Sequence, residues 1–571
     1  MSPGRSSITQ ASGVEVLDIS GIRIPVDQLD GTLRTEELAL RKAVRRRLHI
    51  TPDDLLSVEP RKRSIDARKK NDVHFLYTAR VALRGGANAE RALLAKLRAH
   101  HAEKNVRTAT DKPFGLPAHL GAQPAKQPVV IGAGCAGLFC ALALAEAGLR
   151  PLLVERGQDA TRRSQAIERF NQTGKLDPES NIQFGLGGAG TFSDGKLATG
   201  TKSPAHRFIL QTFVDAGAPR EILWDAKPHV GSDILPTVVT NILNRIRDLG
   251  GEVRLECRLT DIGIARNPSP HVTSVTLEWR DAETGLVVEE QVPTDNLVLA
   301  CGHSARDVFE LLKGRGVTLE RKTFAMGVRI EHLQSMVDKS QYGPFAGHPA
   351  LGAAPYKLVS HLADGRSAFS FCMCPGGYVV AAASEPGGVV TNGMSLSDRA
   401  GTNANSGFLA NVFPTDLPGD DVLEGVTLQR RCERAAFEAG GGNYVAPAQL
   451  VADFLQGVSS SAQGSIVPTY PRGVAWGSVE KCLPPYITET LRASIPKMAH
   501  QLRGFDTPDA VLTGVETRSS SPVRVTRGKD CQSVSTHGLW PCGEGAGYAG
   551  GIMSAATDGL RVAQALVDSL R

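Results

Sequence analysis

One stretch of this chain constrains its fold more than any other: residues 128–157, PVVIGAGCAGLFCALALAEAGLRPLLVERG. An apolar run, a glycine turn, an Ala- and Leu-rich segment and a second apolar run predict a strand, a helix and a second, parallel strand. The turn matches G-x-G-x-x-G: Gly132 makes the turn, Gly134 admits a pyrophosphate, and Gly137 lets the helix pack on the strand. Glu155 closes the second strand, where an acid holds a ribose diol. The stretch therefore predicts a dinucleotide site, with the start of the helix facing the phosphates.

A second match, GLGGAG at 185–190, lacks this context. The preceding residues, LDPESNIQF, are polar and contain no apolar strand, and TFSDGK starts no helix because Ser193 to Gly195 breaks one. No acid closes a following strand, since Asp215 falls within a predicted helix. We therefore expect no second dinucleotide site here. The glycines instead favour a loop pressed against the ligand of the first turn over a plain flexible loop.

A late segment, CGEGAGYAGGIMSAATDGL, separates the two kinds of dinucleotide. It ends a predicted strand with Glu544 and opens a helix at Gly550 and Gly551. An acid there can hold a ribityl or pyrophosphate-side hydroxyl, and the positive helix end can offset the charge of a reduced flavin ring. An NAD protein needs no such return segment, so the pattern favours FAD.

Together these motifs resemble a family, the uncharacterised bacterial FAD-dependent dehydrogenases of the glutathione-reductase-like superfamily. The resemblance covers nearly the whole chain. Its segments are VVIGAGCAGLFCALALAEAG, GGAGTFSDGKL, LACGHSARD, FAMGVRIEH, FCMCPGGYVVAAASEPGGVVTNGMS, CGEGAGYAGGIMSAATDGL and, near the amino terminus, RSIDARKK.

The resemblance implies a two-dinucleotide-type FAD fold with an inserted β-rich domain, but no substrate. It implies that Gly188 and Gly190 run beside the pyrophosphate or flavin and that Gly302 passes near it. Glu544 and Gly551 would serve the ribityl and ring end, and Glu544 stands where the superfamily more often has Asp. The residues implied for the cofactor are thus Gly132, Gly134, Gly137, Glu155, Gly188, Gly190, Gly302, Glu544 and Gly551.

The expected fold class is α/β (α+β overall), with a Rossmann-like FAD-binding domain, an inserted β-rich substrate domain and an N-terminal ferredoxin-like domain. The first domain has the order strand-helix-strand-strand-helix-strand. Its elements are expected at 22–26, 34–48, 55–60, 73–83, 89–101 and 105–109. The expected domains are residues 1–110, a linker at 111–127, the FAD domain at 128–309 and 511–571, and the insertion at 310–510, interpreted mostly as hairpins and loops.

Composition excludes several classes of protein. No apolar run reaches the ~18–20 residues of a membrane span. The opening residues 1–13 hold no secretory signal, and their Ser-rich, acid-free start leaves a transit peptide conceivable but not favoured. Ten cysteines without a repeating interval make no disulfide framework, so we expect a cytoplasmic protein. No Cys/His cluster has metal-ligand spacing, and no metal is expected.

Two sites contain side chains that could take part in redox or acid–base chemistry. Cys372 and Cys374 form C-x-C at the end of a predicted hairpin strand. Residues i and i+2 of an extended strand lie ~6.5–7 Å apart, at or beyond the limit for a disulfide. The following PGG turn could relax this, so a redox dithiol stays open beside the favoured packing role. His303 follows Gly302, where loop hydrogen bonding is favoured over catalysis, and no catalytic acid or base is assigned.

The amino-terminal region is basic: residues 1–113 contain 22 Lys and Arg against 14 Asp and Glu. Its run RKRSIDARKK (61–70) is interpreted as a solvated surface, with phosphate binding and an interdomain contact through Asp66 as alternatives. A nucleic-acid partner is disfavoured but stays open, since few aromatics accompany the run. The residues that would bind RNA are Arg61, Lys62, Arg63, Lys69 and Lys70.

We therefore expect an FAD-dependent oxidoreductase that transfers hydride or electrons between a small-molecule substrate and flavin. The sequence contains only one glycine motif with the strand and helix of a dinucleotide site. NAD(P)H would therefore bind transiently, or a partner would supply the electrons. The rival hypothesis is a flavin-containing RNA- or partner-binding protein in which FAD is structural or senses redox state.

Overall fold

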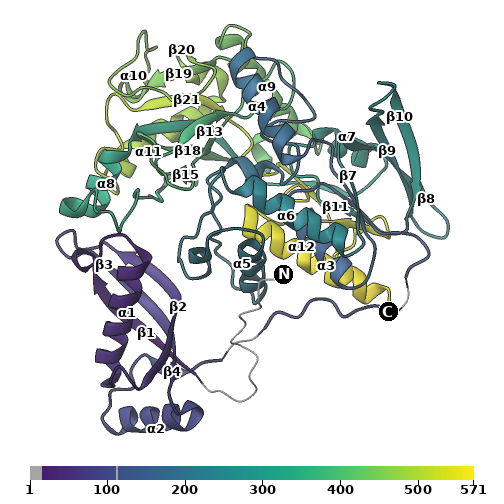
Figure 1. Ribbon diagram of the computed structural model, residues 1–571. Coiled ribbons are helices and arrows are strands. Elements are labelled where there is room, and N and C mark those ends of the chain that lie inside the picture. Colours follow the sequence, from purple (N-terminus) through teal and green to yellow (C-terminus); the bar gives the residue numbers. More distant parts are fainter. Residues whose placement is uncertain (1–15, 111–112, 122) are drawn as a thin grey trace. The chain divides into compact units, whose positions relative to one another are not determined.

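The computed structural model describes residues 16–110, 113–121 and 123–571 (Figure 1). The described chain forms two units. The smaller unit holds the residues up to Pro113 with 221–228 and 341–352, and the larger holds the rest. The opening segment 1–13 and linker positions 111, 112 and 122 lie outside the described residues. The other positions of the expected linker form no helix or strand.

The smaller unit has the ferredoxin-like order that the sequence predicts. Its elements are β1 (Leu17–Pro25), α1 (Leu33–Leu48), β2 (Leu55–Asp66), β3 (His74–Leu83), α2 (Gly86–Ala99) and β4 (Val106–Thr108). The sheet order is β2-β3-β1-β4. Helix α1 begins at Thr32, whose side chain accepts the Thr35 N–H, and it ends with three arginines, which suit the helix dipole.

A five-stranded parallel sheet forms the core of the larger unit. Its order is β23 (Leu539–Pro541), β11 (Leu297–Leu299), β5 (Val129–Ile131), β6 (Leu152–Val154) and β7 (Glu252–Arg254). The four strands β5, β6, β11 and β23 are buried along their whole length, as expected for a parallel sheet covered on both faces. The predicted strand-helix-strand unit is therefore confirmed at the centre of the sheet.

Helices α3 (Cys135–Glu146), α6 (Leu235–Asp248) and α12 (Ile552–Ser569) run side by side (Figure 1). Helix α3 is apolar on every side, so it can be covered on every side. Helix α12 approaches it closely because Gly559 has no side chain: a Cβ there would lie 2.2 Å from the Ala136 carbonyl oxygen. The end of the chain thus returns to the glycine turn at residue 132.

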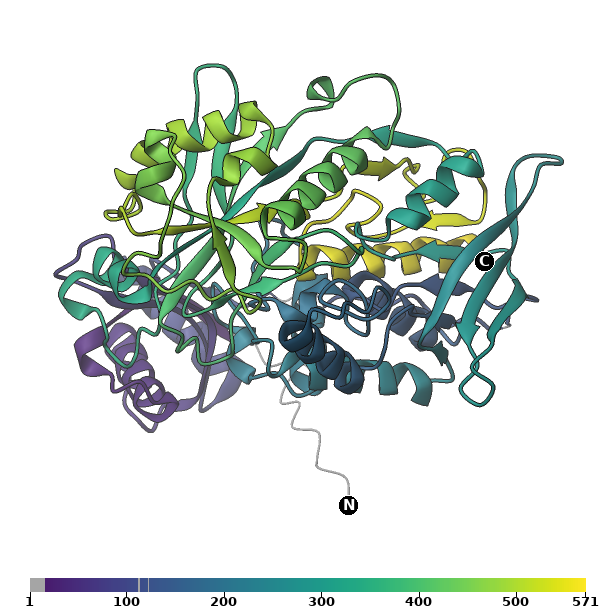
Figure 2. The same ribbon diagram turned by 90° about the horizontal axis from the view of Figure 1, so that it is seen from above.

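The larger unit also contains an antiparallel three-stranded sheet, a seven-stranded sheet that is antiparallel except for the pair β19-β20, and the two-stranded sheets β12-β22 and β16-β17. The first is β10-β9-β8, formed by β8 (Cys257–Ala265), β9 (His271–Arg280) and β10 (Val287–Pro293), drawn in teal at the right edge of Figure 2. The second, drawn mainly in green, has the order β14-β15-β18-β13-β21-β19-β20. Its central strands are β13 (Phe324–Leu333), β15 (Ser367–Cys374), β18 (Asn403–Val412), β19 (Ala446–Leu450) and β21 (Val511–Glu516). Strand β21 pairs with β13 and β19, so it belongs to the inserted sheet although it follows residue 510.

The insertion also contains two long helices where the sequence was interpreted as hairpins and loops. They are α9 (Glu424–Ala439) and α11 (Pro485–Ala499). A short 3-10 helix at Ala189–Phe192 begins within the second glycine loop (185–190), where no helix was expected. The remaining elements are α4 (Ala160–Thr173), α5 (Ala205–Asp215), α7 (Arg306–Gly314), α8 (Gln334–Tyr342), α10 (Val451–Gln456), β12 (Leu319–Arg321), β14 (Val359–His361), β16 (Tyr378–Ala381), β17 (Thr391–Met394), β20 (Val474–Trp476) and β22 (Val523–Val525).

Candidate functional site

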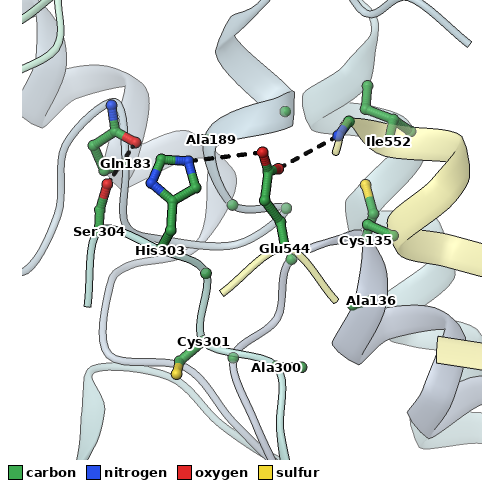
Figure 3. Close-up of a pocket in the computed structure, with 18 of the residues that line it drawn as sticks. Cys135, Ala136, Gln183, Ala189, Ala300, Cys301, His303, Ser304, Glu544 and Ile552 are labelled. Atoms are coloured by element: carbon green, nitrogen blue, oxygen red, sulfur yellow. Dashed lines mark hydrogen bonds and ion pairs between the residues drawn. The ribbon is translucent and has the colours of Figure 1, made fainter. Parts of the chain in front are cut away.

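A cavity of ≈ 390 Å³ lies at the carboxyl ends of the parallel strands in the larger unit. Its walls include Gly132 after β5, Glu155 after β6 and Cys301 after β11. Ligands of open α/β sheets bind at this edge, and pockets of ~300–1,000 Å³ are typical of small-molecule sites. Figure 3 shows the part of the cavity beside the start of α12.

The structure brings eight of the nine expected cofactor residues to this cavity. They are Gly132, Gly134, Glu155, Gly188, Gly190, Gly302, Glu544 and Gly551. Gly137 is absent from the lining because it packs inside the turn, where a Cβ would lie 1.8 Å from the Gly132 carbonyl oxygen. Its expected role, close packing of helix on strand, agrees with this position.

The glycines of the first turn are needed for different reasons. Gly132 has φ 98°, and a Cβ there would lie 2.5 Å from the Ala300 carbonyl oxygen. Gly134 has an ordinary φ of −75°, and a Cβ would meet nothing nearer than the Gly188 Cα at 3.8 Å. The fold therefore does not require glycine at 134. A bound group that approaches the backbone from the cavity does explain it.

The second glycine loop lies directly on the first. The Gly187 N–H donates to the Ala133 carbonyl at 2.8 Å, and Gly134 and Gly187 form an isolated parallel bridge. Gly185, Gly187 and Gly188 have φ values of 118°, 87° and 65°. This loop is pressed against the site, as the sequence indicates. Part of its glycine content, however, comes from its own backbone conformation and from contact with the first turn.

Glu155 connects the two loops. One of its oxygens accepts the Ala133 N–H at 2.8 Å, and the other accepts the N–H groups of Gly157 and Gly185 at 3.0 and 2.9 Å. A carboxylate has about four acceptor positions, so three are occupied by backbone. The residue expected to hold a ribose diol therefore positions both glycine loops in this structure. Its contact with ribose stays a prediction.

Two helices begin at the cavity, α3 after Gly134 and α12 after Gly551. Their positive ends and free N–H groups favour negatively charged ligand groups. Gly550, which also lines the cavity, has no positive φ, and a Cβ there would meet nothing within 4 Å. Like Gly134, it is a glycine that the fold does not require.

Glu544 lies between His303 and the start of α12 (Figure 3). Its carboxylate accepts the Gly551 N–H at 3.4 Å, and the other oxygen lies 3.8 Å from the His303 Nε2. Burial raises the pKa of Glu544 to about 7. Burial, with Arg518 nearby, lowers the pKa of His303 to about 3, so this imidazole is neutral near pH 7. Glu544 is the group of this pair that changes charge near neutral pH.

The inserted region contributes Phe371 and Cys372 of β15 and Asn392 of β17 to the cavity lining. The sequence analysis missed cations that also line the cavity, among them Lys196 and Arg518. Lys196 lies 2.9 Å from the Asp194 carboxylate, and Arg518 donates to Glu433. Lys196 belongs to the segment GGAGTFSDGKL, which was already singled out for its glycines. Nothing in the residues around Arg518 signals the cavity.

In the smaller unit, some residues of the basic run 61–70 form ion pairs within that unit. Arg63 pairs with Glu36 at 2.8 Å and with Asp225 at 2.6 Å, and Arg68 pairs with Asp66. The Lys70 ammonium donates to a backbone carbonyl. An arginine held by two carboxylates is less available to a phosphate backbone.

Three family models match the chain. A model described as "FAD binding domain" matches residues 127–201, and "FAD-dependent protein, C-terminal domain-like" matches 323–519. A domain of unknown function matches residues 16–82. An uncharacterised protein of Clostridium beijerinckii is 40% identical over 546 residues, which cover 95% of this chain and 98% of the relative. The chain belongs to this FAD-dependent protein family.

The cofactor of this family member is FAD, and the protein is an enzyme of the flavoprotein oxidoreductase kind. Solved flavoproteins are only distantly similar. A flavoprotein/dehydrogenase from Cytophaga hutchinsonii is 13% identical, with 79% of each chain covered and a TM-score of 0.33. The glycerol-3-phosphate dehydrogenase from Bacillus halodurans complexed with FAD is 12% identical, with 78% of this chain and 65% of that chain covered and a TM-score of 0.35.

Two further findings concern residues 16–110, 113–121 and 123–571. None of their helices is both long and apolar enough to cross a membrane. Within the same ranges, no three His, Cys, Asp or Glu side chains are grouped so that they could hold a metal ion.

Proposed function

We propose that the cavity orders FAD with its diphosphate against the turn at 132–137 and its ring end beside Glu544 and the start of α12. The proposed cofactor contacts are Gly132, Gly134, Glu155, Gly188, Gly190, Gly302, Glu544 and Gly551, with Gly137 supporting the turn. The main support for this proposal is that Gly134 and Gly550 line the cavity although the protein itself has room for a side chain at both positions. When bound, the flavin supplies hydride or electron transfer.

The proposed reaction transfers hydride or electrons between a small-molecule substrate and the flavin. The substrate enters between the cofactor and the inserted region, where Phe371 and Asn392 offer one apolar and one amide surface. Lys196 and Arg518 also line the cavity, but Asp194 and Glu433 pair with them and balance their charge. Transient NAD(P)H, or a partner protein, serves as the second redox substrate.

The pair His303 and Glu544 gives the site a means to handle a proton. A carboxyl with a pKa near 7 can release or accept a proton close to neutral pH. The neutral His303 can donate or accept a hydrogen bond without adding a positive charge. Protons that accompany hydride transfer can therefore pass through Glu544.

A pair of matched substitutions tests the cofactor site. Gly134→Ala adds one methyl group to the cavity wall. Gly314→Ala adds one at the end of α7, where a Cβ also meets nothing within 4 Å. We expect Gly134→Ala to lose at least tenfold in FAD affinity with an unchanged melting temperature of the FAD-stripped protein, and Gly314→Ala to keep its FAD. Equal FAD content in both purified variants, measured by chromatography of the released cofactor, would contradict the proposed placement.

A second experiment addresses the reaction. The purified protein is titrated anaerobically with NADH, NADPH and a panel of metabolites while the visible flavin band is followed. Bleaching by a nicotinamide supports the transient donor. Bleaching by one metabolite, and by neither nicotinamide, identifies that metabolite as the substrate and indicates that the second redox partner is a protein. A flavin that none of them reduces contradicts the proposed small-molecule reaction.

We place the protein in a reducing cytoplasm. All ten cysteines lie within the described residues, and none is in a disulfide. Most are buried, as is usual for structural cysteines of intracellular proteins.

A further inference from the structure

The C-x-C segment lies on the wall of the FAD cavity, and its two cysteines differ in exposure. Cys372 is exposed and lines the cavity, whereas Cys374 is buried behind it. A redox-active pair needs one sulfur that a substrate can reach and one that can resolve the mixed disulfide. The exposure of the two cysteines fits such a division of roles.

The backbone here is not a regular strand. Phe371 of β15 pairs with Gly407 of β18, and Cys374 pairs with Asn405, so two β15 residues oppose a single β18 residue in this β-bulge. Cys372 has φ 41°, and the Cys374 Sγ lies 3.1 Å from the Cys372 carbonyl oxygen. The second side chain is thus folded back onto the first residue. The extended separation that argued against a disulfide in the sequence does not apply.

A fixed cation accompanies the inner sulfur. Arg329 is fully buried, and its Nη2 donates to the Cys372 carbonyl at 2.9 Å and lies 3.6 Å from the Cys374 Sγ. Glu516 and Asn405 hold this guanidinium in place. A guanidinium at this distance favours the thiolate, which is the form that attacks a disulfide.

Burial raises the pKa of the Cys374 thiol, and Lys196 and Arg329 oppose this shift. The inner sulfur therefore lies beside cations that lower the free energy of its thiolate, while Cys372 is exposed at the cavity wall.

We propose that Cys372 and Cys374 form a dithiol/disulfide couple that exchanges two electrons with the flavin, and that Cys372 is the sulfur that reacts with a dithiol substrate. The inference rests on the proposed placement of FAD in this cavity. The chemistry balances: two S–H bonds break, one S–S bond forms, and FAD takes up two electrons and two protons as FADH2. The substrate dithiol then restores the couple by thiol–disulfide exchange and is itself oxidised to a disulfide.

The stoichiometry of reduction tests the couple. The FAD-loaded protein is oxidised with diamide, freed of reagent and titrated anaerobically with dithionite. We expect four electrons per FAD for the unmodified protein and two for Cys372→Ser and Cys374→Ser. The control Cys482→Ala removes a buried cysteine of the same inserted region and keeps four. Two electrons in the unmodified protein would overturn the proposal.

Mass spectrometry tests the same couple without the flavin. Both cysteines fall in one tryptic peptide, residues 367–399, which contains no other cysteine. After diamide and N-ethylmaleimide, we expect this peptide to carry no adduct and to weigh two hydrogens less than the dithiol form. A peptide with two adducts overturns the couple even if Cys374→Ser fails to fold. A protein that binds no FAD contradicts the proposed function, whereas one that binds FAD and accepts only two electrons contradicts the couple alone.

Dithiothreitol serves as the probe for the substrate class. We expect it to reduce the flavin of the FAD-loaded protein anaerobically, and Cys372→Ser to slow this at least tenfold. An unchanged rate in Cys372→Ser would show that the flavin is reached by another route and would remove Cys372 from the exchange.

Discussion

The two glycine loops beside the cavity match one sequence pattern and use glycine differently. In the turn at 132–137, strand β5 and helix α3 fix the backbone, and close packing requires Gly132 and Gly137. Gly134 remains open to the cavity. In the loop at 185–190, neither a strand nor an α-helix fixes the backbone, and Gly185 and Gly187 are needed for their positive φ.

A glycine pattern therefore indicates a nucleotide site only when a strand precedes it and a helix follows it. The first loop is built by its own strand and helix, which are local in sequence. The second takes its shape from the first, through the Gly187 N–H to Ala133 and through Glu155. A pattern match alone would have given two nucleotide sites where the structure has one cavity with two loops in its wall.

The largest expected effect is in the first loop, at Gly137. Gly137→Ala places a Cβ 1.8 Å from a backbone oxygen, which cannot move aside as a side chain can. We expect the larger unit to lose at least about 3 kcal/mol of unfolding free energy, because overpacking against fixed backbone forces the helix off the strand. Urea unfolding followed by tryptophan fluorescence measures this. A midpoint equal to that of Gly314→Ala would show that the turn is not built as described.

Glu155 accepts hydrogen bonds from both glycine loops, so a substitution there tests whether the second loop depends on the first. Glu155→Gln leaves one acceptor oxygen for three N–H donors and points an NH2 group at others, so we expect a loss of about 2–3 kcal/mol. Glu168→Gln, on the exposed side of α4, is the matched control and should change stability by less than about 0.5 kcal/mol. If both variants unfold at the same urea concentration, the second loop does not depend on this carboxylate.

The parts of the fold that could be predicted are those whose signals are local. The strand, turn and helix at 128–147 and the order of the ferredoxin-like unit were readable because periodicity, capping and glycine spacing lie within single segments. The helix α9 was missed because its buried face includes the polar residues Gln429 and Glu433 beside Val426 and Ala436, so apolar periodicity does not mark that face in the sequence.

The rest of the site could not be predicted because separate segments create it. Lys196 and Arg518 reach one cavity from positions more than 300 residues apart. The bulge at Cys372 arises from the pairing of β15 with β18, so the sequence of β15 alone gives an extended strand and the wrong separation of the two cysteines. The sequence argument left a dithiol open beside a packing role, and the bulge removes the extended-strand objection to it.

Gly188 is a glycine that its backbone conformation requires, whereas Gly134 faces the cavity without such a requirement, and the effects expected for these two are smaller. Gly188 has φ 65°, and a Cβ there would lie 3.0 Å from the Gly134 Cα, so we expect Gly188→Ala to cost about 1–2 kcal/mol of stability and to weaken FAD binding as well. Gly134→Ala should weaken FAD binding alone. The two quantities are measured together by urea unfolding of the FAD-stripped proteins and by fluorescence titration with FAD. Equal unfolding midpoints for the two variants would remove the distinction between the loops.

The smallest effect belongs to Gly190, the one residue of the second loop that resembles Gly134. It has no positive φ, and a Cβ would meet the Ile552 Cγ1 at 3.1 Å, a side-chain atom that can move by a few tenths of an ångström. We expect Gly190→Ala to change stability by less than about 0.5 kcal/mol and FAD affinity by less than tenfold, and Ile552→Ala in the same chain, which removes the contacting Cγ1, to restore the affinity. A loss of FAD as large as that of Gly134→Ala, unrelieved by Ile552→Ala, would mean that the second loop meets the cofactor as closely as the first. The first loop would then no longer be the main contact of the diphosphate.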